Sequence, residues 1–212
     1  MVARQRPLPA TAIWGENMNT ALEVMSLRKA FGGIQAVKGV SLSVRAGEVL
    51  GIIGPNASGK STLFNLIAGV VKPDGGAVHI FGHNVTGWRP HRIARLGLGR
   101  TFQIPTTFLK MTVRRNLTVA GLAQPRGRTP RELEVEVDRW LEFLQLDHLA
   151  NEPAENLSGG QMKLLELGRV LMTLPRIVLL DEIAAGVSPV MVREISTYIR
   201  ALNARGITFL VI

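Results

Sequence analysis

The feature that most constrains the fold is a glycine-rich turn between an apolar strand and a helix. The apolar run VLGII at Val49–Ile53 leads into GPNASGKST, after which the apolar spacing of FNLIAGV becomes helical. Residues Gly54–Ser61 match G-x-x-x-x-G-K-[ST], a loop whose backbone N–H groups and following helix N-terminus surround phosphate. In this pattern Lys60 reaches the β- and γ-phosphates, and the Ser61 hydroxyl ligates Mg²⁺. We therefore expect an α/β fold in which VLGII is a strand buried on both faces of a parallel sheet.

Composition limits the class of protein. The chain has 212 residues, 46% hydrophobic and 19% charged, which is enough to bury a core and too apolar for a disordered chain. It has no cysteine, which excludes a disulfide scaffold, a Cys-ligated metal site and a thiol nucleophile. No apolar run approaches the roughly 18 residues of a membrane span. We expect residues 1–17 to form a disordered leader outside the fold.

The net charge of +9 is concentrated in one segment. Between Arg89 and Arg131 there are ten Lys or Arg residues and no Asp or Glu. A solvated basic face is one interpretation of this segment. The other interpretations are a polyanion partner and an anionic membrane surface.

The middle of the chain has the pattern of a helical insertion. Thr129 is a capping residue, Pro130 occupies the first helical position and Glu132 is the reciprocal cap. Apolar residues then recur on one face, namely Leu133, Val137, Trp140, Leu141 and Leu144. Further helices are expected after Ser158 and over residues 190–204. Short strands are expected at residues 22–24, 40–44, 177–180 and 207–212.

Two carboxylates end the apolar strand IVLL. Asp181 and Glu182 would lie at the carboxyl edge of a parallel sheet, where open α/β folds bind ligands. Asp181 could hold Mg²⁺, and Glu182 could position or deprotonate an attacking water. Helix capping by the two acids is the alternative.

The segment LSGGQ at 157–161 opens a helix. Ser158 is a natural N-cap, and the two glycines expose N–H groups at the positive helix end. An ordinary capped helix and a second anion site are both compatible with this pattern.

GPNASGKST, LSGGQ and LLDE, in this order and spacing, resemble the nucleotide-binding subunits of ATP-binding-cassette (ABC) transporters over residues 20–212. The LSGGQ pentapeptide separates this family from other phosphate-loop NTPases. RTFQ at 100–103 resembles the family's glutamine loop, and Phe31 of KAFGG resembles the aromatic residue that stacks on adenine. By pattern alone, Phe31 is more often a core residue and Gln103 a surface amide. Within the family, RTFQ, VRRNLTVAGLA and DEIAAGVSP are most similar to the LivG-type ATPase of branched-chain amino-acid importers.

The resemblance implies a P-loop NTPase with a RecA-like α/β core, an N-terminal antiparallel β subdomain and a helical insertion. The expected parts are the leader at 1–17, the β subdomain with the first part of the core at 18–101, the glutamine loop with the helical subdomain at 102–161, and the second part of the core at 162–212. The implied function is Mg·ATP hydrolysis that drives import, with ATP and Mg²⁺ as cofactors.

The resemblance also implies partners and a location. Two such chains, identical or related, would pair head to tail and contact permease subunits at the cytoplasmic face of the inner membrane. The basic segment would then lie towards the membrane, and no nucleic acid is expected as a partner.

The resemblance implies a role for each motif residue. Glu182, Gln103 and Lys60 are the expected catalytic residues, and Ser61, Gln103 and Asp181 are the expected Mg²⁺ ligands. The expected nucleotide contacts are Phe31, Gly54, Pro55, Asn56, Ala57, Ser58, Gly59, Lys60, Ser61 and Thr62, together with Ser158, Gly159, Gly160 and Gln161, which reach the nucleotide of a paired chain.

Several positions depart from the family pattern. Ala57 replaces a glycine, Ile183 a proline, and Ser188 the Asp or Asn of the D-loop. No histidine of the chain matches the family's switch position, so we expect a truncated domain that binds nucleotide better than it hydrolyses it. The alternatives are a soluble ABC ATPase that acts on nucleic acid or ribosomes, and a non-hydrolysing fragment.

Overall fold

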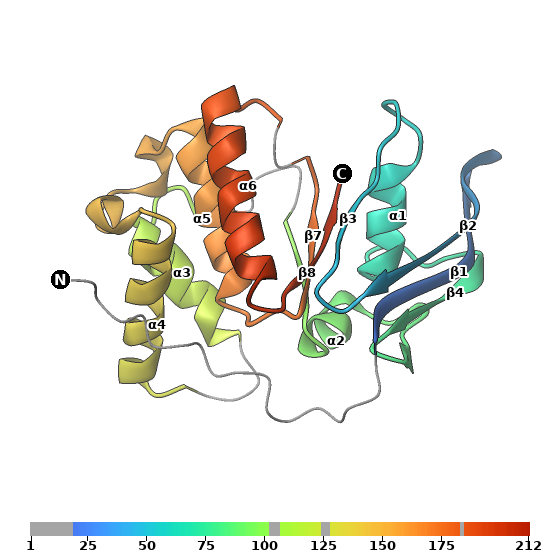
Figure 1. Ribbon diagram of the computed structural model, residues 1–212, viewed down its shortest axis with the longest axis horizontal. Coiled ribbons are helices and arrows are strands. Elements are labelled where there is room, and N and C mark those ends of the chain that lie inside the picture. Colours follow the sequence, from blue (N-terminus) through green and yellow to red (C-terminus); the bar gives the residue numbers. More distant parts are fainter. Residues whose placement is uncertain (1–18, 102–106, 124–127, 183–184) are drawn as a thin grey trace.

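The computed structural model describes residues 19–101, 107–123, 128–182 and 185–212. The expected leader, Gln103 and Ile183 lie outside these ranges. A parallel sheet forms the centre of the molecule, with one helix and an antiparallel sheet on one side and a group of helices on the other (Figure 1). The α/β class with an antiparallel β subdomain and a helical part is therefore confirmed. The residue boundaries between the parts remain predictions.

The antiparallel sheet is built on one long hairpin. Its strand order is β2 (Ile34–Arg45), β1 (Thr20–Phe31), β4 (Gly75–Ile80) and β5 (His83–Asn84). The strands expected at 22–24 and 40–44 lie near the start of β1 and the end of β2, and both strands extend to a turn at Gly32 and Gly33. Both glycines have positive φ, which such a turn requires. The hairpin extends beyond its apolar centre because strand pairing uses backbone groups, whatever the exposure of the side chains.

The parallel sheet carries the most buried strand. Its order is β3 (Val49–Gly51), β8 (Thr208–Val211), β7 (Ile177–Leu180) and β6 (Leu98–Arg100). All four residues of β7 are fully buried. Ile177 and Leu179 belong to the cluster around α1 (Lys60–Ile67), whereas Val178 and Leu180 belong to the cluster of the helical side. β7 therefore joins the two cores of the molecule.

The prediction that VLGII is buried on both faces of the sheet is wrong. Among the strands that the structure describes, β3 is at the edge of the sheet and pairs only with β8, and it ends at Gly51. Val49 is 46% exposed and Ile53 is 98% exposed. An apolar run alone cannot distinguish a central strand from an edge strand, because strand order is decided by the topology.

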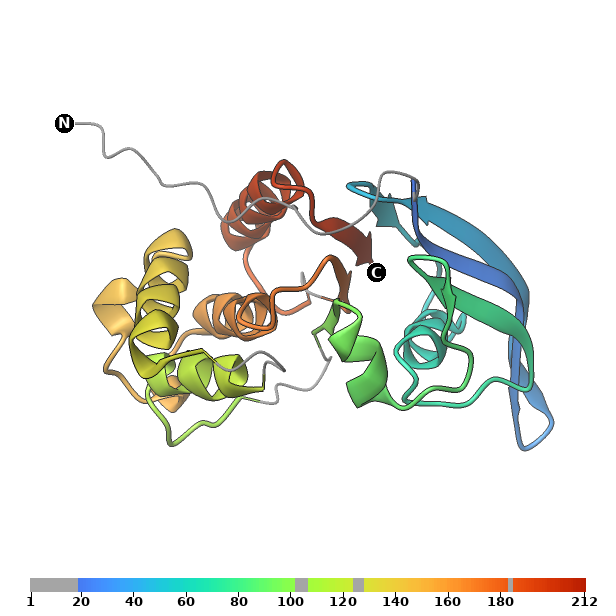
Figure 2. The same ribbon diagram turned by 90° about the horizontal axis from the view of Figure 1, so that it is seen from below.

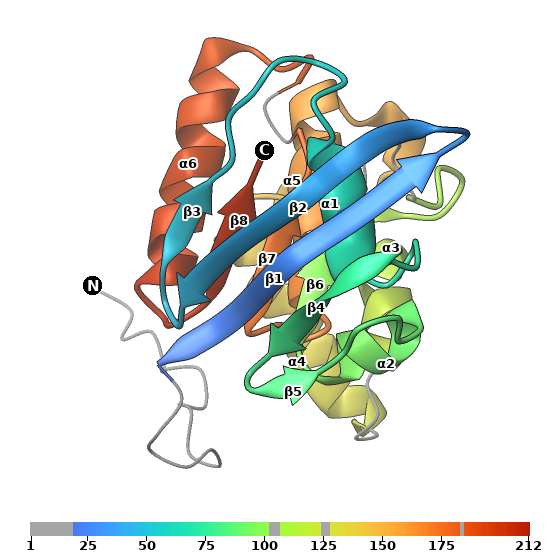
Figure 3. The ribbon, with the colours of Figure 1, turned by 90° about the vertical axis from the view of Figure 1, so that its right-hand side faces the viewer.

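Helix α1 lies between the two sheets, under the β1–β2 hairpin (Figure 3). Its residues Leu63, Phe64, Leu66 and Ile67 are buried. This packing holds α1, the helix that follows the glycine-rich loop, between the parallel sheet and the β1–β2 hairpin.

The segment predicted as a helical insertion contains α3 (Val113–Leu122) and α4 (Pro130–Phe143), which lie on the other side of the parallel sheet (Figure 2). The helices α5 (Gly159–Leu171) and α6 (Pro189–Asn203), expected largely in the second part of the core, lie on the same side, while the short α2 (Pro90–Arg95) precedes β6. The Thr129–Glu132 capping box is present, and every apolar residue predicted on the inner face of α4 is buried. At Gly121 a Cβ would lie 2.4 Å from Leu133 and 2.5 Å from Met172, so α3 packs closely against its neighbours. Among the helices that the structure describes, none has the length and apolar character needed to cross a membrane.

Candidate active site

The glycine-rich loop is closed around the ammonium group of Lys60. Its Nζ donates hydrogen bonds of 2.7 Å to the carbonyl oxygens of Gly54 and Pro55, and lies 3.4 Å from Ser58 Oγ. Gly54 to Ser58 are exposed, whereas Gly59, Lys60 and Ser61 are half-buried. Ser61 is the second residue of α1 and lies directly at the positive end of that helix. This geometry is suited to an anionic ligand, because it brings a cation, backbone N–H groups and a helix N-terminus together.

Gly59 and Ala57 both have left-handed backbone conformations. Gly59, the N-cap of α1, has φ 92°, and a Cβ there would lie 2.1 Å from the carbonyl oxygen of Ala36. Ala57 has φ 62°, a conformation that L-residues other than glycine rarely adopt. The departure from glycine at position 57 therefore changes the backbone energy of the loop as well as adding a methyl group.

Phe31 is not a core residue. Phe31 is the last residue of β1, and it is 48% exposed. Lys29 Nζ lies 5.4 Å from the ring centroid and forms a 2.7 Å ion pair with Asp74, whose other oxygen accepts a hydrogen bond from Ala30 N–H. The hydrogen bond from Lys29, together with that from Ala30, lowers the pKa of Asp74. The expectation from the pattern alone that Phe31 is a core residue is therefore wrong, and its stacking on a base remains a prediction.

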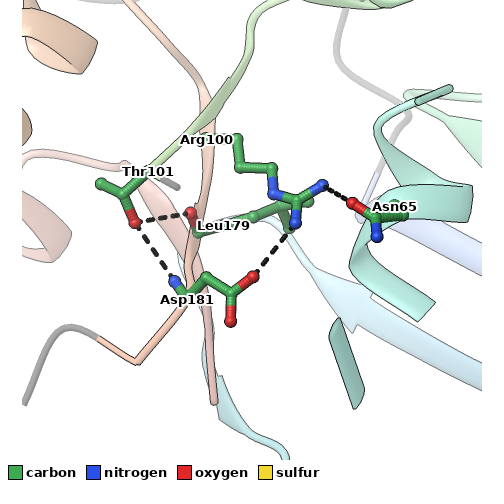
Figure 4. A network of polar contacts seen from close by, with 5 residues as sticks. All are labelled: Asn65, Arg100, Thr101, Leu179 and Asp181. Carbon is green, nitrogen blue, oxygen red and sulfur yellow. Dashed lines mark hydrogen bonds and ion pairs between the residues drawn. The ribbon is translucent and has the colours of Figure 1, made fainter. Parts of the chain in front are cut away.

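Asp181 is buried at the carboxyl end of β7. It is 2% exposed, and its Oδ2 lies 3.0 Å from Arg100 Nη2 (Figure 4). Its backbone N–H donates to Thr101 Oγ1 at 3.1 Å. Its Oδ1 is also buried, and within the described part of the chain it has no hydrogen-bond partner. A buried carboxylate oxygen without a partner suits a hard cation, which takes oxygen ligands.

Glu182 follows with a strained backbone. Its φ is 47°, its N–H donates to the carbonyl oxygen of Ile212 at 2.9 Å, and its side chain is half-buried. Left-handed non-glycine residues of this kind cluster at functional sites. Neither acid caps a described helix, because the N-cap of the following helix α6 is Ser188, whose Oγ accepts from Met191 N–H at 3.3 Å. The capping interpretation of Asp181 and Glu182 is therefore wrong.

The segment from Ser158 to Gln161 forms a reciprocal cap on α5. Ser158 Oγ accepts from Gln161 N–H at 3.3 Å, and Gln161 Oε1 accepts from Ser158 N–H at 2.9 Å. For the residues described here, no hydrogen bond or ion pair links this segment to the loop at 54–61. α5 belongs to the helical side and α1 to the side of the antiparallel sheet (Figure 2).

The basic segment is partly neutralised by acids from elsewhere in the chain. Arg100 pairs with Asp181. Lys110 pairs with Glu155 and Arg114 with Asp138, each at 2.7 Å. A local charge count could not reveal these partners, because they lie far along the chain. The sequence also gives no sign that Arg100 belongs to the site, because it marks this residue only as the first of RTFQ.

Residues 37–185 match a family model described as ABC transporter. A probable branched-chain amino acid transport ATP-binding protein, LivG, of Methanocaldococcus jannaschii is 41% identical over 211 residues, which cover 92% of this chain and 81% of the relative. A crystal structure of the ADP conformation of an ATP-binding cassette of an ABC transporter has a TM-score of 0.81 at 41% identity, covering 91% of this chain and 80% of that one. A dimeric post-hydrolysis structure of an ATP-binding cassette, bound to ADP and Pi, has a TM-score of 0.80 at 26% identity, covering 90% and 86%.

Proposed function

The chain belongs to the ABC transporter family of ATP-binding proteins, and from this premise we propose that it hydrolyses Mg·ATP to drive the import of branched-chain amino acids. The observation that carries the proposal is the loop around Lys60, together with Asp181 Oδ1 at the end of β7, which has no hydrogen-bond partner among the residues that the structure describes. The solute class rests on the likeness to the archaeal LivG relative.

Nucleotide binding would begin at the loop of residues 54–62. Lys60 exchanges its contacts with the carbonyl oxygens of Gly54 and Pro55 for β- and γ-phosphate oxygens. The backbone N–H groups of Asn56, Ala57, Ser58 and Gly59 and the first turn of α1, with Ser61 and Thr62, supply the remaining donors. The exposed ring of Phe31 stacks on the base.

The chain's own side chains would then orient the reaction. The Ser61 hydroxyl, Asp181 Oδ1 and Gln103 would hold Mg²⁺, which would neutralise charge at the phosphate oxygens. Glu182 orients the attacking water and accepts its proton, and Lys60 stabilises the charge that develops on the γ-phosphate oxygens. Catalysis then depends mainly on positioning and electrostatics.

The complete site would be shared between two chains. Ser158, Gly159, Gly160 and Gln161 of one chain contact the γ-phosphate bound to the loop of the other, since α5 and the loop lie on different sides of one molecule. The dimeric structure of a family member with ADP and Pi supports this pairing. Permease subunits at the cytoplasmic face of the membrane are the other partners.

Nucleotide binding and hydrolysis test the proposal separately. Lys60→Ala should abolish binding of a fluorescent ATP analogue, whereas Lys110→Ala, at an exposed ion pair, should not change it. In the assembled transporter, Glu182→Gln should abolish ATP-driven uptake of labelled leucine into vesicles. If the transporter took up only an unrelated solute and no leucine, the result would contradict branched-chain amino acids as the transported solutes. Salt-sensitive DNA binding without any transport would favour the soluble ABC ATPase instead.

A further inference from the structure

Arg100 bridges the helix after the phosphate loop and the strand that carries Asp181. Its Nη1 donates to Asn65 Oδ1 at 2.7 Å, and its Nη2 pairs with Asp181 Oδ2 at 3.0 Å (Figure 4). The side chains of Arg100 and Asp181 are only 7% and 2% exposed. Removing two charges from water is costly, so a buried pair of this kind is weak evidence for stability alone. A role in the site is the better explanation.

The bridge connects the two elements that carry the proposed Mg²⁺ ligands. Asn65 follows Ser61 by four residues in α1, so the two side chains lie on the same helix face, one turn apart. Arg100 also lies over the ring of Phe64, with its Cζ 5.9 Å from the centroid. The guanidinium group of Arg100 therefore links Asp181 to the helix α1 that carries Ser61.

The last residue of β6 and the residue that follows it hold Asp181 at two points. Arg100 binds the side chain, and the next residue, Thr101, accepts the hydrogen bond from the Asp181 backbone N–H. The pairing of β6 with β7 places Arg100 beside Leu179, two residues before Asp181. One carboxylate oxygen is thus engaged, while Oδ1 remains without a partner in the described ranges.

We propose that Arg100 is a positioning residue that clamps Asp181 by Oδ2 and Asn65 by its amide, so that Asp181 Oδ1 is presented to Mg²⁺ next to Ser61. This inference rests on the proposed function, in which Asp181 and Ser61 hold the ion. Arg100 itself touches neither nucleotide nor water in this role.

The role requires an arginine. The planar guanidinium offers two donors in fixed directions, one for each partner, whereas a lysine ammonium is a single point charge. Arg100→Lys therefore keeps the charge and loses the bridge.

The opposite interpretation makes the opposite prediction. If Arg100 instead served as a counter-charge that Mg²⁺ must displace from Asp181, weakening its contact would make Mg²⁺ binding tighter. The sign of the change in Mg²⁺ dependence separates the two interpretations.

The test measures binding of N-methylanthraniloyl-ATP by fluorescence, in EDTA and across a Mg²⁺ titration, with the full chain. Loss of an outer contact to a metal ligand typically weakens metal binding about 10- to 100-fold, and we expect a shift of this order in the Mg²⁺ midpoint for Arg100→Lys. The affinity in EDTA should not change. Asn65→Ala should shift the midpoint in the same direction by less, because the ion pair remains. Arg114→Lys, which alters an exposed arginine–aspartate pair, is the matched control and should shift nothing.

The Asp181→Asn background tests whether Arg100 acts through Asp181. In this background Arg100→Lys should cause no further shift, since both changes act on the same oxygen ligand. An unchanged or lowered Mg²⁺ midpoint in Arg100→Lys overturns the proposal. If that variant does not fold, an unchanged midpoint in Asn65→Ala overturns it equally. Failure of the wild-type chain to bind the analogue would instead contradict the proposed function.

Discussion

The carbonyl oxygen of Ala36 lies 2.1 Å from the point where any residue other than glycine would place its Cβ at position 59. Strand β2 therefore packs directly on the start of α1, and the phosphate loop is in contact with the antiparallel sheet. The contact is with backbone, which cannot rotate away as a flexible side chain can. The shape of the loop thus depends on Ala36, a residue of β2 that lies more than twenty positions before Gly59.

Gly59→Ala should destabilise the chain and abolish nucleotide binding. The left-handed conformation alone costs an L-residue about 1–2 kcal/mol, and the clash with Ala36 adds to it. Urea unfolding and fluorescent ATP-analogue binding measure the two effects. Gly47→Ala is the matched control, because Gly47 also has positive φ but has open space around its Cβ position. Equal destabilisation by both variants would show that the contact with β2 is unimportant.

Ala57→Gly should stabilise the chain. At φ 62° glycine avoids a backbone strain of about 1 kcal/mol, part of which is offset by the greater entropy of glycine in the unfolded chain. Urea unfolding should therefore show a gain of up to about 1 kcal/mol in the free energy of unfolding. Ala46→Gly, at an exposed turn where φ is not positive, should give no gain. If Ala57→Gly lowered the free energy of unfolding as much as Ala46→Gly does, the result would contradict a strained backbone at position 57.

Glu182→Gln should leave ATP binding intact and reduce hydrolysis. General base catalysis typically contributes about 10²- to 10⁴-fold, and we expect a loss of this order in steady-state ATPase activity of the assembled transporter. Glu155→Gln removes a carboxylate from an exposed ion pair and should retain activity. Full turnover in Glu182→Gln would remove this residue from the mechanism.

Glu166 should make stability fall as the pH rises. Burial raises the pKa of Glu166, although Lys163 at 3.6 Å and Arg169 oppose the shift. The group also lines a hollow of about 290 Å³ that it shares with Arg100 and Arg169. A raised carboxyl pKa means that the folded state holds the proton more tightly, so its contribution is fully present below the unfolded pKa and is lost as the pH rises through the folded pKa.

The comparison of wild type with Glu166→Gln isolates this effect. The variant cannot ionise, so its stability advantage over wild type, measured by urea unfolding, should grow as the pH rises from acid to neutral. Glu142→Gln, at an exposed position on α4, should show no such trend. A difference that is flat across the pH range would mean that Glu166 has an ordinary pKa in the folded chain.

The loop and the helices of this protein follow from local sequence. The strand–turn–helix pattern at 49–67, the capping residues Thr129 and Ser158 and the buried face of α4 are all present in the structure. Their hydrogen bonds join residues no more than a few positions apart, and their apolar spacing repeats within one helix or strand. The sequence by itself therefore determined these elements and marked the residues at the ends of the strands.

The order of the strands and the pairing of charges were decided only by the tertiary structure. The edge position of β3, the placement of β6 beside β7 and the ion pair between Arg100 and Asp181 all join segments that are distant along the chain. The run VLGII has the composition of a central strand, and RTFQ gives no local sign of a buried partner. Such contacts depend on which apolar faces pack together, and that is a property of the assembled cores around β7 rather than of any single segment.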